Sequence, residues 1–284
     1  MTNMESNPAK IDGALKTRIR SALVFGVVVL GGIYLGGIAF TLLMAAAAAI
    51  CVYEWGRMVL SAQAVHKLLL PLAAGLTALA VAASGLADNP AMTLWVLLAF
   101  CFLVFTFNAS AGGPSVRHLI FGVIYIGFSI EVMIWLRNSS GHGIYNMLTL
   151  LLIVWASDIS AYFSGRSIGG PKLAPVISPK KTWAGFFGSS VGAGIAAAAL
   201  ACPWVLTKFD VTTIGNLSWQ GYAATGFVLA MFGQAGDLLI SMFKRHYGVK
   251  DTGTIIPGHG GLLDRIDALL LVALLFGTLT MLLR

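Results

Sequence analysis

Charged side chains that could bind phosphate or metal are concentrated in one stretch, residues 233–267, GQAGDLLISMFKRHYGVKDTGTIIPGHGGLLDRID. It holds four of the chain's eleven carboxylates, four Lys and Arg residues, two His residues and a Gly-rich turn. The charged residues are Asp237, Lys244, Arg245, Lys250, Asp251, Asp264, Arg265 and Asp267. The stretch begins and ends in hydrophobic runs. Ionisable groups at membrane depth are costly, so these groups indicate a functional site.

Spacing places several of these groups on shared helical faces. Asp237, Ser241 and Lys244 lie at i, i+4 and i+7, which is one face of a helix. Asp264 and Asp267 open the next apolar run at i and i+3. Asp264 could alternatively be a simple helix cap. A cap would leave Asp237 and the cations between the two runs unexplained, so we expect a single site.

A glycine-rich turn separates the two runs. Gly253, Gly258, Gly260 and Gly261 permit unusual backbone angles, and successive N–H groups in such turns can form an anion-binding nest. Carboxylates beside phosphate-binding cations indicate Mg²⁺, which is usually held by one or two carboxylates together with substrate phosphates. The three cysteines have no spacing typical of zinc. No Walker motif or kinase glycine loop is present, so ordinary NTPase and kinase folds are not supported.

A second polar stretch precedes this one, at VWASDISAYFSGRSIGGPKLAPVISPKKTWAG. Asp158 and Tyr162 lie at i and i+4, on one helical face. The segment after them is rich in Gly, Pro and Lys and cannot continue a span. Irregular backbone at membrane depth must be buried in protein or line a wet cavity, although an ordinary solvated loop is the alternative. A candidate phosphate cradle within it consists of Ser178, Pro179, Lys180, Lys181 and Thr182.

The elements that must position these residues are membrane spans. Hydrophobic residues make up 58% of the chain and charged residues 10%, far below the charged share of soluble domains. The mean hydropathy is +0.86, and the apolar residues come in long runs. We therefore expect an all-α, polytopic integral membrane protein with about nine transmembrane helices and a polar cavity facing the cytoplasm. The predicted spans are 21–37, 38–53, 68–87, 91–108, 119–136, 145–165, 185–206, 220–242 and 264–283.

The distribution of the net charge of +7 predicts orientation. With the N-terminus in the cytoplasm, fifteen Lys and Arg residues fall on the cytoplasmic side. Only Arg137, Lys208 and Arg284 fall opposite. This is the positive-inside pattern, so the charge indicates topology and a phosphate-rich site, and we expect no nucleic-acid partner.

The N-terminal part of the chain predicts three segments. Residues 10–20 suit either a short interfacial helix or a basic tail. Residues 21–53 form an apolar run too long for one span, and we expect two short spans that reverse at Gly31, Gly32, Gly36 or Gly37. The organisation is then a basic cytoplasmic segment at 1–20, scaffold spans with dimer contacts at 21–144, and a catalytic region at 145–284.

Two further features have structural interpretations. Glu131 lies within a predicted span, where a hydrogen bond to a neighbouring helix and a role in the cavity are equally supported. The span at 185–206 is rich in Gly and Ala, whose small side chains let helices approach closely. We therefore expect this span to lie centrally in the bundle.

The sequence from Ser241 to Asp267 resembles the C-terminal motif of the phosphatidate cytidylyltransferase (CDP-diacylglycerol synthase) family. This motif is long and specific. It reads S-M-F-K-R-x4-K-D-x-G-x3-P-G-H-G-G-x2-D-R-I-D. Residues 157–183, SDISAY to SPKKTW, resemble that family's second characteristic region. The N-terminal third is similar in hydropathy alone.

The resemblance implies the reaction of CTP with phosphatidic acid to give CDP-diacylglycerol and pyrophosphate. It implies Mg²⁺ with a second, monovalent cation such as K⁺, membrane lipids as surroundings, a homodimer, and a bacterial inner membrane location with the site on the cytoplasmic face. By motif, Asp237 and Asp264 resemble metal ligands. The catalytic group adds Lys244, Arg245, Lys250, His259 and Arg265. The substrate-binding group is Asp158, Tyr162, Ser178, Lys180, Lys181, Thr182, Ser241, Asp251, Gly260, Gly261 and Asp267, with Asp251 and Asp267 orienting the cations.

The chain departs from the family pattern at two positions. Ile240 and Ala184 stand where the family usually carries Glu. Because position 240 is three residues after Asp237, we expect its side chain to border the metal-ligand face. Ile would then leave the protein with a weaker hold on Mg²⁺ than Glu provides.

Two alternative functions are compatible with parts of the pattern. A CTP-dependent polyprenol kinase of the dolichol type has a similar C-terminal motif but would transfer the γ-phosphoryl group of CTP. A transporter or lipid-binding protein could use intramembrane Asp and Lys residues and would release no pyrophosphate. The SPKKTW region and the complete PGHGG to DRID motif favour the transferase.

Overall fold

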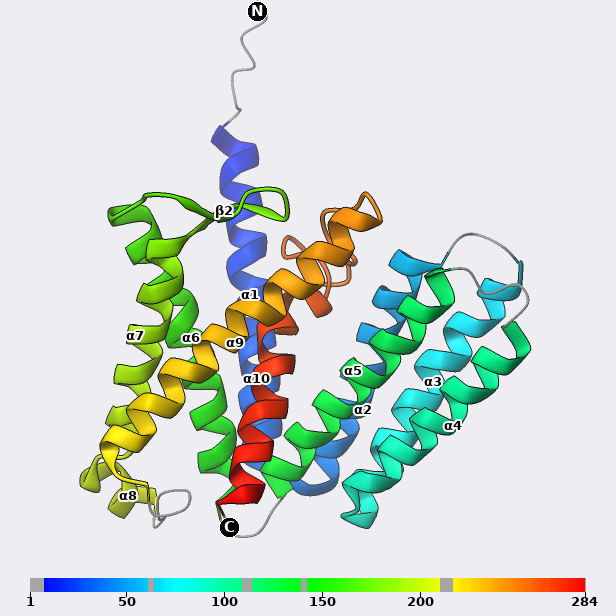
Figure 1. The fold of residues 1–284 in the computed structure, drawn as a ribbon, viewed down its shortest axis with the longest axis horizontal. Coiled ribbons are helices and arrows are strands. Elements are labelled where there is room, and N and C mark those ends of the chain that lie inside the picture. The colour runs from blue at the N-terminus through cyan, green and yellow to red at the C-terminus, as the bar shows by residue number, and fades with distance from the viewer. Residues whose placement is uncertain (1–7, 61–63, 109–113, 139–141, 210–216, 284) are drawn as a thin grey trace, which may run out of the picture.

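The structure, a computed structural model, describes residues 8–60, 64–108, 114–138, 142–209 and 217–283. Figure 1 shows a bundle of long helices with one short β-ribbon at its upper end. The all-α membrane class is confirmed, while the ribbon was not predicted. In order, the elements are α1 (Pro8–Leu35), α2 (Gly37–Val59), α3 (Ala64–Ala87), α4 (Pro90–Asn108), α5 (Pro114–Asn138), α6 (Gly143–Ser167), β1 (Lys172–Ala174), β2 (Ser178–Thr182), α7 (Trp183–Leu200), α8 (Pro203–Phe209), α9 (Trp219–His246) and α10 (Leu263–Leu282).

The helices match the predicted spans closely. Among the described residues, eight helices are long and apolar enough to cross a membrane. A shorter apolar helix, Ala91–Phe102, lies within the predicted span 91–108. The long apolar run at the N-terminus does divide into two spans, as expected.

The reversal between α1 and α2 falls at Gly36 and Gly37, whose φ angles are +62° and +50°. A β-carbon at Gly36 would collide with the guanidinium of Arg137, at the end of α5. That guanidinium donates to the carbonyls of Ile33 and Tyr34, which are free at the end of α1. Arg137 therefore fixes the turn that the glycines permit.

The N-terminal residues differ from both expectations. Residues 10–20 form neither a separate interfacial helix nor a tail, because α1 runs without a break from Pro8 to Leu35. The basic residues thus extend the first span beyond the bundle, where α1 projects upward in Figure 1.

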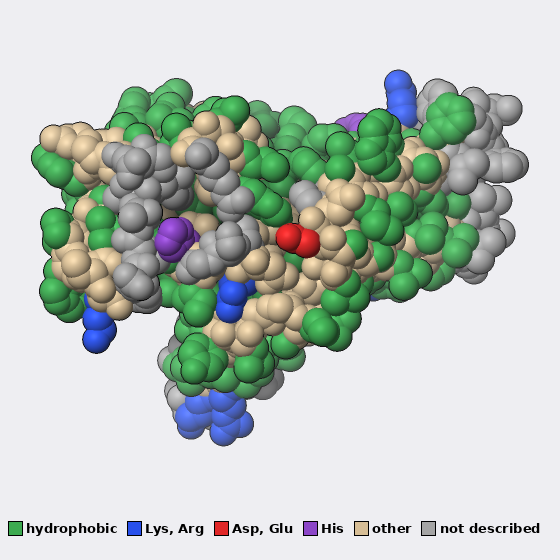
Figure 2. All heavy atoms as spheres, turned by 90° about the horizontal axis from the view of Figure 1, so that it is seen from below, with side chains coloured by type: hydrophobic (Ala, Val, Ile, Leu, Met, Phe, Trp, Pro, Cys, Tyr) green, Lys and Arg blue, Asp and Glu red, His purple; other side chains and the backbone are tan. Residues whose placement is uncertain are grey.

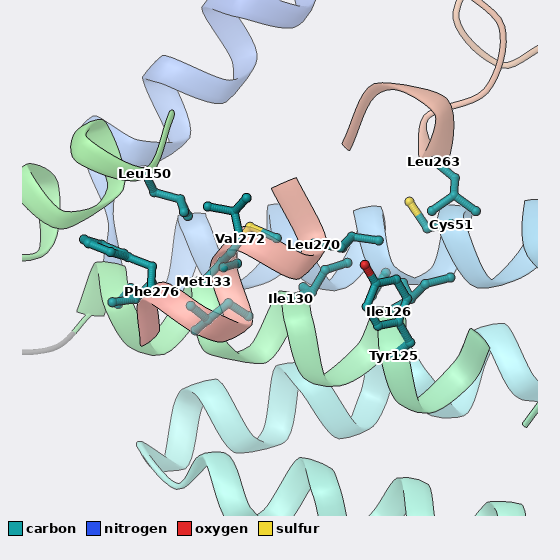
Figure 3. Packing of buried hydrophobic residues seen from close by; sticks show 14 of the residues in the cluster. Cys51, Tyr125, Ile126, Ile130, Met133, Leu150, Leu263, Leu270, Val272 and Phe276 are labelled. Atoms are coloured by element: carbon teal, nitrogen blue, oxygen red, sulfur yellow. The ribbon is translucent and has the colours of Figure 1, made fainter. Parts of the chain in front are cut away.

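The last helix, α10, packs against α9, α5, α6 and α2. Figure 3 shows Leu270, Val272 and Phe276 of α10 among the side chains of the neighbouring helices, including Ile130 and Met133 of α5. All five are buried. The expectation that the Gly- and Ala-rich span would be central was wrong, since α7 lies at the edge of the bundle in Figure 1.

Small residues instead serve the close packing of α7 against α6 and α9. A β-carbon at Gly188 or Gly192 would collide with Ser164 or Ser160 of α6, and one at Gly226 of α9 would lie 2.5 Å from the carbonyl of Ala193. These contacts make α6·α7 and α7·α9 closely packed helix pairs.

The predicted loops of the site do lie on one side. The N-terminal end of α1, the β-ribbon and the connection between α9 and α10 are at the upper end in Figure 1, whereas α8 and the C-terminus are at the lower end. The view of the lower face in Figure 2 shows a surface dominated by hydrophobic side chains, with few charges. Glu131 accepts hydrogen bonds from Ser84 and Thr93, so its structural interpretation is confirmed.

We predict that Gly36→Ala lowers the thermal stability of the protein. An L side chain at positive φ is strained, and here it would also displace Arg137. The expected loss is about 1 kcal/mol or more, or roughly 3 °C in Tm. Gly31→Ala is the matched control, because a β-carbon there has no atom within 4 Å. Equal melting temperatures of the two variants in detergent would contradict the role of the turn.

Candidate active site

Five carboxylates line one cavity of about 380 Å³ where α6, α9 and α10 meet. Two cations, Lys244 and Arg265, line it with them. The carboxylates are Asp158, Asp237, Asp251, Asp264 and Asp267. The fold thus brings carboxylates from α6, α9, α10 and the α9–α10 connection to one cavity. Carboxylates from adjacent elements repel one another unless cations stand among them, so the site is suited to bind positive charge.

Asp264 is the most fully bonded of these carboxylates. Its Oδ1 is 2.8 Å from Nζ of Lys244, and the two side chains are only 6% and 10% exposed. Its Oδ2 accepts from the backbone N–H and hydroxyl of Thr252, at 2.8 and 3.1 Å, and from the N–H of Gly261 at 3.1 Å. Because these donors come from the preceding loop, Asp264 is more than a cap of its own helix.

Asp237 has fewer hydrogen-bond partners than Asp264, and its side chain is more exposed to solvent. Its Oδ2 lies 2.7 Å from Nζ of Lys181 on β2, and its side chain is 33% exposed. Its Oδ1 accepts from Ser241 at 3.1 Å, which confirms the predicted shared face. Lys181 also donates to the Gln234 side chain at 2.7 Å. Each of the two candidate metal ligands is therefore paired with its own lysine.

A second cavity of about 370 Å³ lies beside the first and is bordered by α6, β2, α7 and α9. Asp158 and Asp237 line both cavities, so the two cavities share part of their walls. The other charged or polar residues lining it are Tyr162, Arg166, Lys180, Lys181, Thr182 and Gln234. Arg166 donates to the Tyr162 hydroxyl at 2.7 Å and also stacks above its ring. Three cations and exposed polar groups make this cavity suitable for a polyanion.

An apolar cavity of about 420 Å³ adjoins the carboxylates on the other side. It is lined mainly by aliphatic and aromatic residues of α1, α2, α6 and α10, such as Phe25, Phe40 and Trp155. Asp158 and Arg265 line its polar end and also the carboxylate cavity. Polar and apolar space therefore meet at the same side chains.

Several predicted site residues contact other parts of the fold. Ser178 pairs with Ala174 in the ribbon, and the Thr182 hydroxyl caps α7 by accepting from Gly185 at 3.1 Å. Arg245 is exposed and donates to the Ile177 carbonyl at 3.2 Å. None of Ser178, Arg245 and Lys250 lines the three cavities described above.

His259 faces α1 and lies outside those cavities. Its Nδ1 is 2.8 Å from the Ser21 hydroxyl, and its carbonyl accepts from Nε of Arg265 at 3.0 Å. The ring thus ties the loop to α1 while the backbone orients Arg265. The role predicted for the ring, handling phosphate charge, remains untested.

The glycine turn is also arranged differently from the predicted nest. Gly258 and Gly260 have positive φ angles, +77° and +87°. The neighbouring N–H groups of Gly261, Leu262 and Leu263 bond to protein carboxylates. These amides hold Asp264 and Glu54 in place of an external anion.

The position expected for the Ile240 side chain was wrong. Its side chain is fully buried in the apolar core and does not line the carboxylate cavity. Asp237 and Lys244 line the cavity from the neighbouring side of α9. The weaker hold on Mg²⁺ stays a prediction.

Sequence reasoning missed Glu54 and Gln234. Glu54 is a charged residue in the apolar α2 and is only 2% exposed. It directly follows the apolar run 21–53, and a carboxylate at the end of a span was a signal that could have been used. Gln234, three residues before Asp237, carries no such signal, because amides are common in ordinary helices.

The donor set of the cavity fits a hard divalent cation. Carboxylate oxygens are the ligands that Mg²⁺ prefers, and one or two suffice when substrate phosphates supply the rest. Within the described residues, no group of three or more His, Cys, Asp or Glu side chains is arranged to hold a metal alone. A site completed by substrate is consistent with both observations.

Comparison with known proteins agrees with this chemistry. The cytidylyltransferase family matches residues 16–283. The chain belongs to this family. It is 36% identical over 264 residues to the phosphatidate cytidylyltransferase of Brucella abortus, covering 92% of this chain and 91% of the relative. It is 32% identical over 271 residues to that of Bacillus subtilis, covering 91% and 94%. The Staphylococcus epidermidis enzyme of the same name is 40% identical over 180 residues, covering 62% and 65%.

Membership makes the protein a nucleotidyltransferase enzyme, in agreement with the interpretation of its motifs. The matched region spans all the described spans and both polar stretches. The family therefore accounts for the whole bundle and not only for the C-terminal motif.

We predict that Arg265→Gln and Arg245→Gln differ strongly in their effect on cytidylyl transfer. Arg265 lines two cavities at the carboxylates, whereas Arg245 contacts the ribbon. Loss of a preorganised cation should lower kcat by about 10²-fold, while the Arg245 variant should keep most of the wild-type rate. The measurement is steady-state turnover of both purified variants. Equal losses would show that the cavity walls do not define the reaction site.

Proposed function

We propose that this protein is a phosphatidate cytidylyltransferase, which converts CTP and phosphatidic acid to CDP-diacylglycerol and pyrophosphate in phospholipid biosynthesis. One observation carries the proposal: a basic cavity and an apolar cavity both adjoin the same carboxylate cavity. A nucleoside triphosphate suits the first, and a lipid suits the second. The names of the relatives from Brucella abortus and Bacillus subtilis support the same substrates.

The basic cavity is the proposed site of CTP. Lys180, Lys181 and Arg166 would face the triphosphate, since ammonium and guanidinium groups bind phosphate oxygens strongly. Lys181 is held by Asp237 and Gln234. Its ammonium group is therefore already oriented before the substrate binds, so the reaction need not reorganise it. Tyr162 stands in the same cavity with a largely exposed ring.

The apolar cavity is the proposed site of the phosphatidate acyl chains. Its walls come from α1, α2, α6 and α10, so the chains would lie at the depth of the bilayer's own hydrocarbon. Arg265 at its polar end would face the lipid phosphate. Its guanidinium is directed by the His259 carbonyl.

The reaction is an in-line displacement at the α-phosphorus of CTP. The phosphatidate oxygen forms the new P–O bond as the bond to the β-phosphate oxygen breaks, and pyrophosphate leaves. A phosphate monoester is already anionic near neutral pH, so no strong general base is needed. The protein's contribution is to position the two anions and to offset their repulsion with Lys181, Lys244 and Arg265.

Asp237 and Asp264 would hold Mg²⁺ together with substrate phosphates, and a monovalent cation such as K⁺ would occupy the remaining carboxylates. When bound, the divalent ion neutralises phosphate charge and polarises the phosphoryl oxygens. Asp267 and Asp251 line the same cavity and would orient the neighbouring cations. Lys244, buried against Asp264, would hold that carboxylate in place in the cavity.

The proposed location is a bacterial inner membrane, with the upper end of the bundle in Figure 1 on the cytoplasmic side. The β-ribbon, the α9–α10 connection and most of the described Lys and Arg residues lie at that end, in agreement with the positive-inside rule. CTP is a cytoplasmic nucleotide, which suits this orientation. The homodimer remains a prediction from family resemblance.

The test of the proposed function is purified protein in detergent with CTP, phosphatidic acid and Mg²⁺. We expect label from the α-phosphate of CTP to enter lipid and unlabelled pyrophosphate to be released. Label from the γ-phosphate in lipid would instead indicate the polyprenol kinase. Absence of both lipid label and pyrophosphate release would contradict the proposed cytidylyl transfer and would favour the transporter or lipid-binding alternative.

We predict that Asp237→Asn abolishes turnover and leaves the bundle folded, because Asp237 is one-third exposed and its amide can still accept from Ser241. Asp264→Asn should abolish turnover and also destabilise the protein, since it leaves Lys244 buried without its partner, at a cost of up to about 3–5 kcal/mol. Glu131→Gln is the control, a buried carboxylate away from the cavity. Near-normal rates in either Asp variant would refute the assignment.

A further inference from the structure

Glu54 is a buried carboxylate that bonds to the start of another helix. Its Oε1 accepts from the N–H of Leu262 at 3.1 Å and its Oε2 from that of Leu263 at 2.9 Å. These are the first amides of α10, and Leu262 at the cap position supplies no side-chain bond of its own. The first N–H groups of a helix lack partners within the helix. Glu54 of α2 therefore caps α10 from about two hundred residues away in sequence.

Thr252 connects this cap to Asp264. Its hydroxyl lies 3.4 Å from Oε2 of Glu54 and 3.1 Å from Oδ2 of Asp264, and its N–H donates to the same Oδ2 at 2.8 Å. A hydroxyl has one proton, so it can donate to only one of the two carboxylates at a time. The two acidic side chains are thus held in a fixed relation by the loop between α9 and α10.

The loop approaches Glu54 so closely that only glycine fits. A β-carbon at Gly261 would lie 2.6 and 2.8 Å from the two carboxylate oxygens of Glu54, and one at Gly253 would collide with the same group. Both glycines have ordinary backbone angles, since neither is among the glycines with positive φ. Their small size, and not their flexibility, is what the site requires.

The segment of α2 that bears Glu54 is itself fixed. Trp55 is fully buried, donates through Nε1 to the His118 carbonyl at 2.8 Å, and packs edge-on against Phe243 of α9 at 4.8 Å between ring centroids. Cys51, one turn earlier, is also fully buried. The backbone on either side of Glu54 is therefore held by buried packing.

We propose that Glu54 is a positioning residue for the transfer reaction: it anchors the start of α10 and thereby places the Asp264–Lys244 pair in the cavity. Glu54 does not line the carboxylate cavity, so it acts through Asp264 and not on substrate. This deepens the proposed function and depends on it only for the kinetic part of its test. A carboxylate that merely stabilised the bundle would leave loop dynamics and kcat of the folded protein unchanged.

The experiment compares Glu54→Gln with the matched variant Glu131→Gln. The amide at position 54 would point its NH₂ at one of two backbone donors and lose that bond. Glu131 accepts from two hydroxyls, which can turn and accept from an amide instead. Both variants replace a buried carboxyl group in an apolar helix with an amide of nearly the same shape.

The first readout is hydrogen–deuterium exchange of peptides covering residues 251–264, in protein without substrate or metal. We expect Glu54→Gln to raise the exchange rate of this loop about tenfold or more over wild type. Glu131→Gln should not change it. Unchanged exchange in Glu54→Gln would overturn the proposal, whatever reaction the enzyme performs.

The second readout is kcat and KM for CTP. Glu54→Gln should lower kcat about tenfold or more with a smaller change in KM, because the CTP cavity has no contact with Glu54. Thr252→Val should lower kcat as well, and the double variant should lose less than the product of the two. Multiplicative losses, or an equal loss in Glu131→Gln, would contradict the network.

Gly261→Ala decides the question if Glu54→Gln does not fold. It keeps the carboxylate, but its β-carbon would collide with the Thr252 hydroxyl and with both carboxylate oxygens of Glu54, so it should reproduce the faster exchange and the lower kcat. Gly75→Ala is its control, because a β-carbon there meets no atom within 4 Å. Wild-type exchange and kcat in Gly261→Ala would overturn the proposal.

Discussion

The bonding of buried carboxylates is the constraint on which this structure depends. A charged group removed from water must be paired or hydrogen-bonded, or it destabilises the fold by several kcal/mol. Asp264 meets this requirement with Lys244 and three loop donors, and Glu54 meets it with two backbone amides. The carboxylates belong to α2 and α10, and their partners come from α9, the loop that follows it and the start of α10. The hydrogen bonds and the ion pair that these carboxylates require therefore hold the elements of the site together.

The same bonds explain why the loop between α9 and α10 has a definite shape without regular secondary structure. Its amides bond to protein carboxylates, its His259 ring meets Ser21 of α1, and its glycines let α2 approach. Irregular backbone near a membrane is stable only when its polar groups are satisfied in this way. The loop thus joins the first two helices of the chain to the last.

Two environments meet at Asp158, which lines both the basic cavity and the apolar cavity. The basic cavity opens beside β2 and α7, and the apolar cavity lies among α1, α2, α6 and α10. A reaction between a water-soluble nucleotide and a membrane lipid requires such a boundary. Moving the charged nucleotide into hydrocarbon, or the acyl chains into water, costs free energy. Small residues on α7 bring α6 and α9 close enough to form one wall of it.

The amino-acid sequence by itself determined the membrane class, the spans, the reversal near Gly36 and the motif of the cytidylyltransferase family. These are local properties, set by hydropathy, backbone freedom and residue order. Only the tertiary structure decided that Glu54 caps α10, that Lys181 pairs with Asp237, that His259 faces α1 and that Ile240 is buried. The first three contacts join residues far apart in the chain, and the burial of Ile240 depends on how α9 is rotated in the bundle. Such contacts arise when whole helices pack against one another, so they cannot be predicted from the residue spacing within one segment.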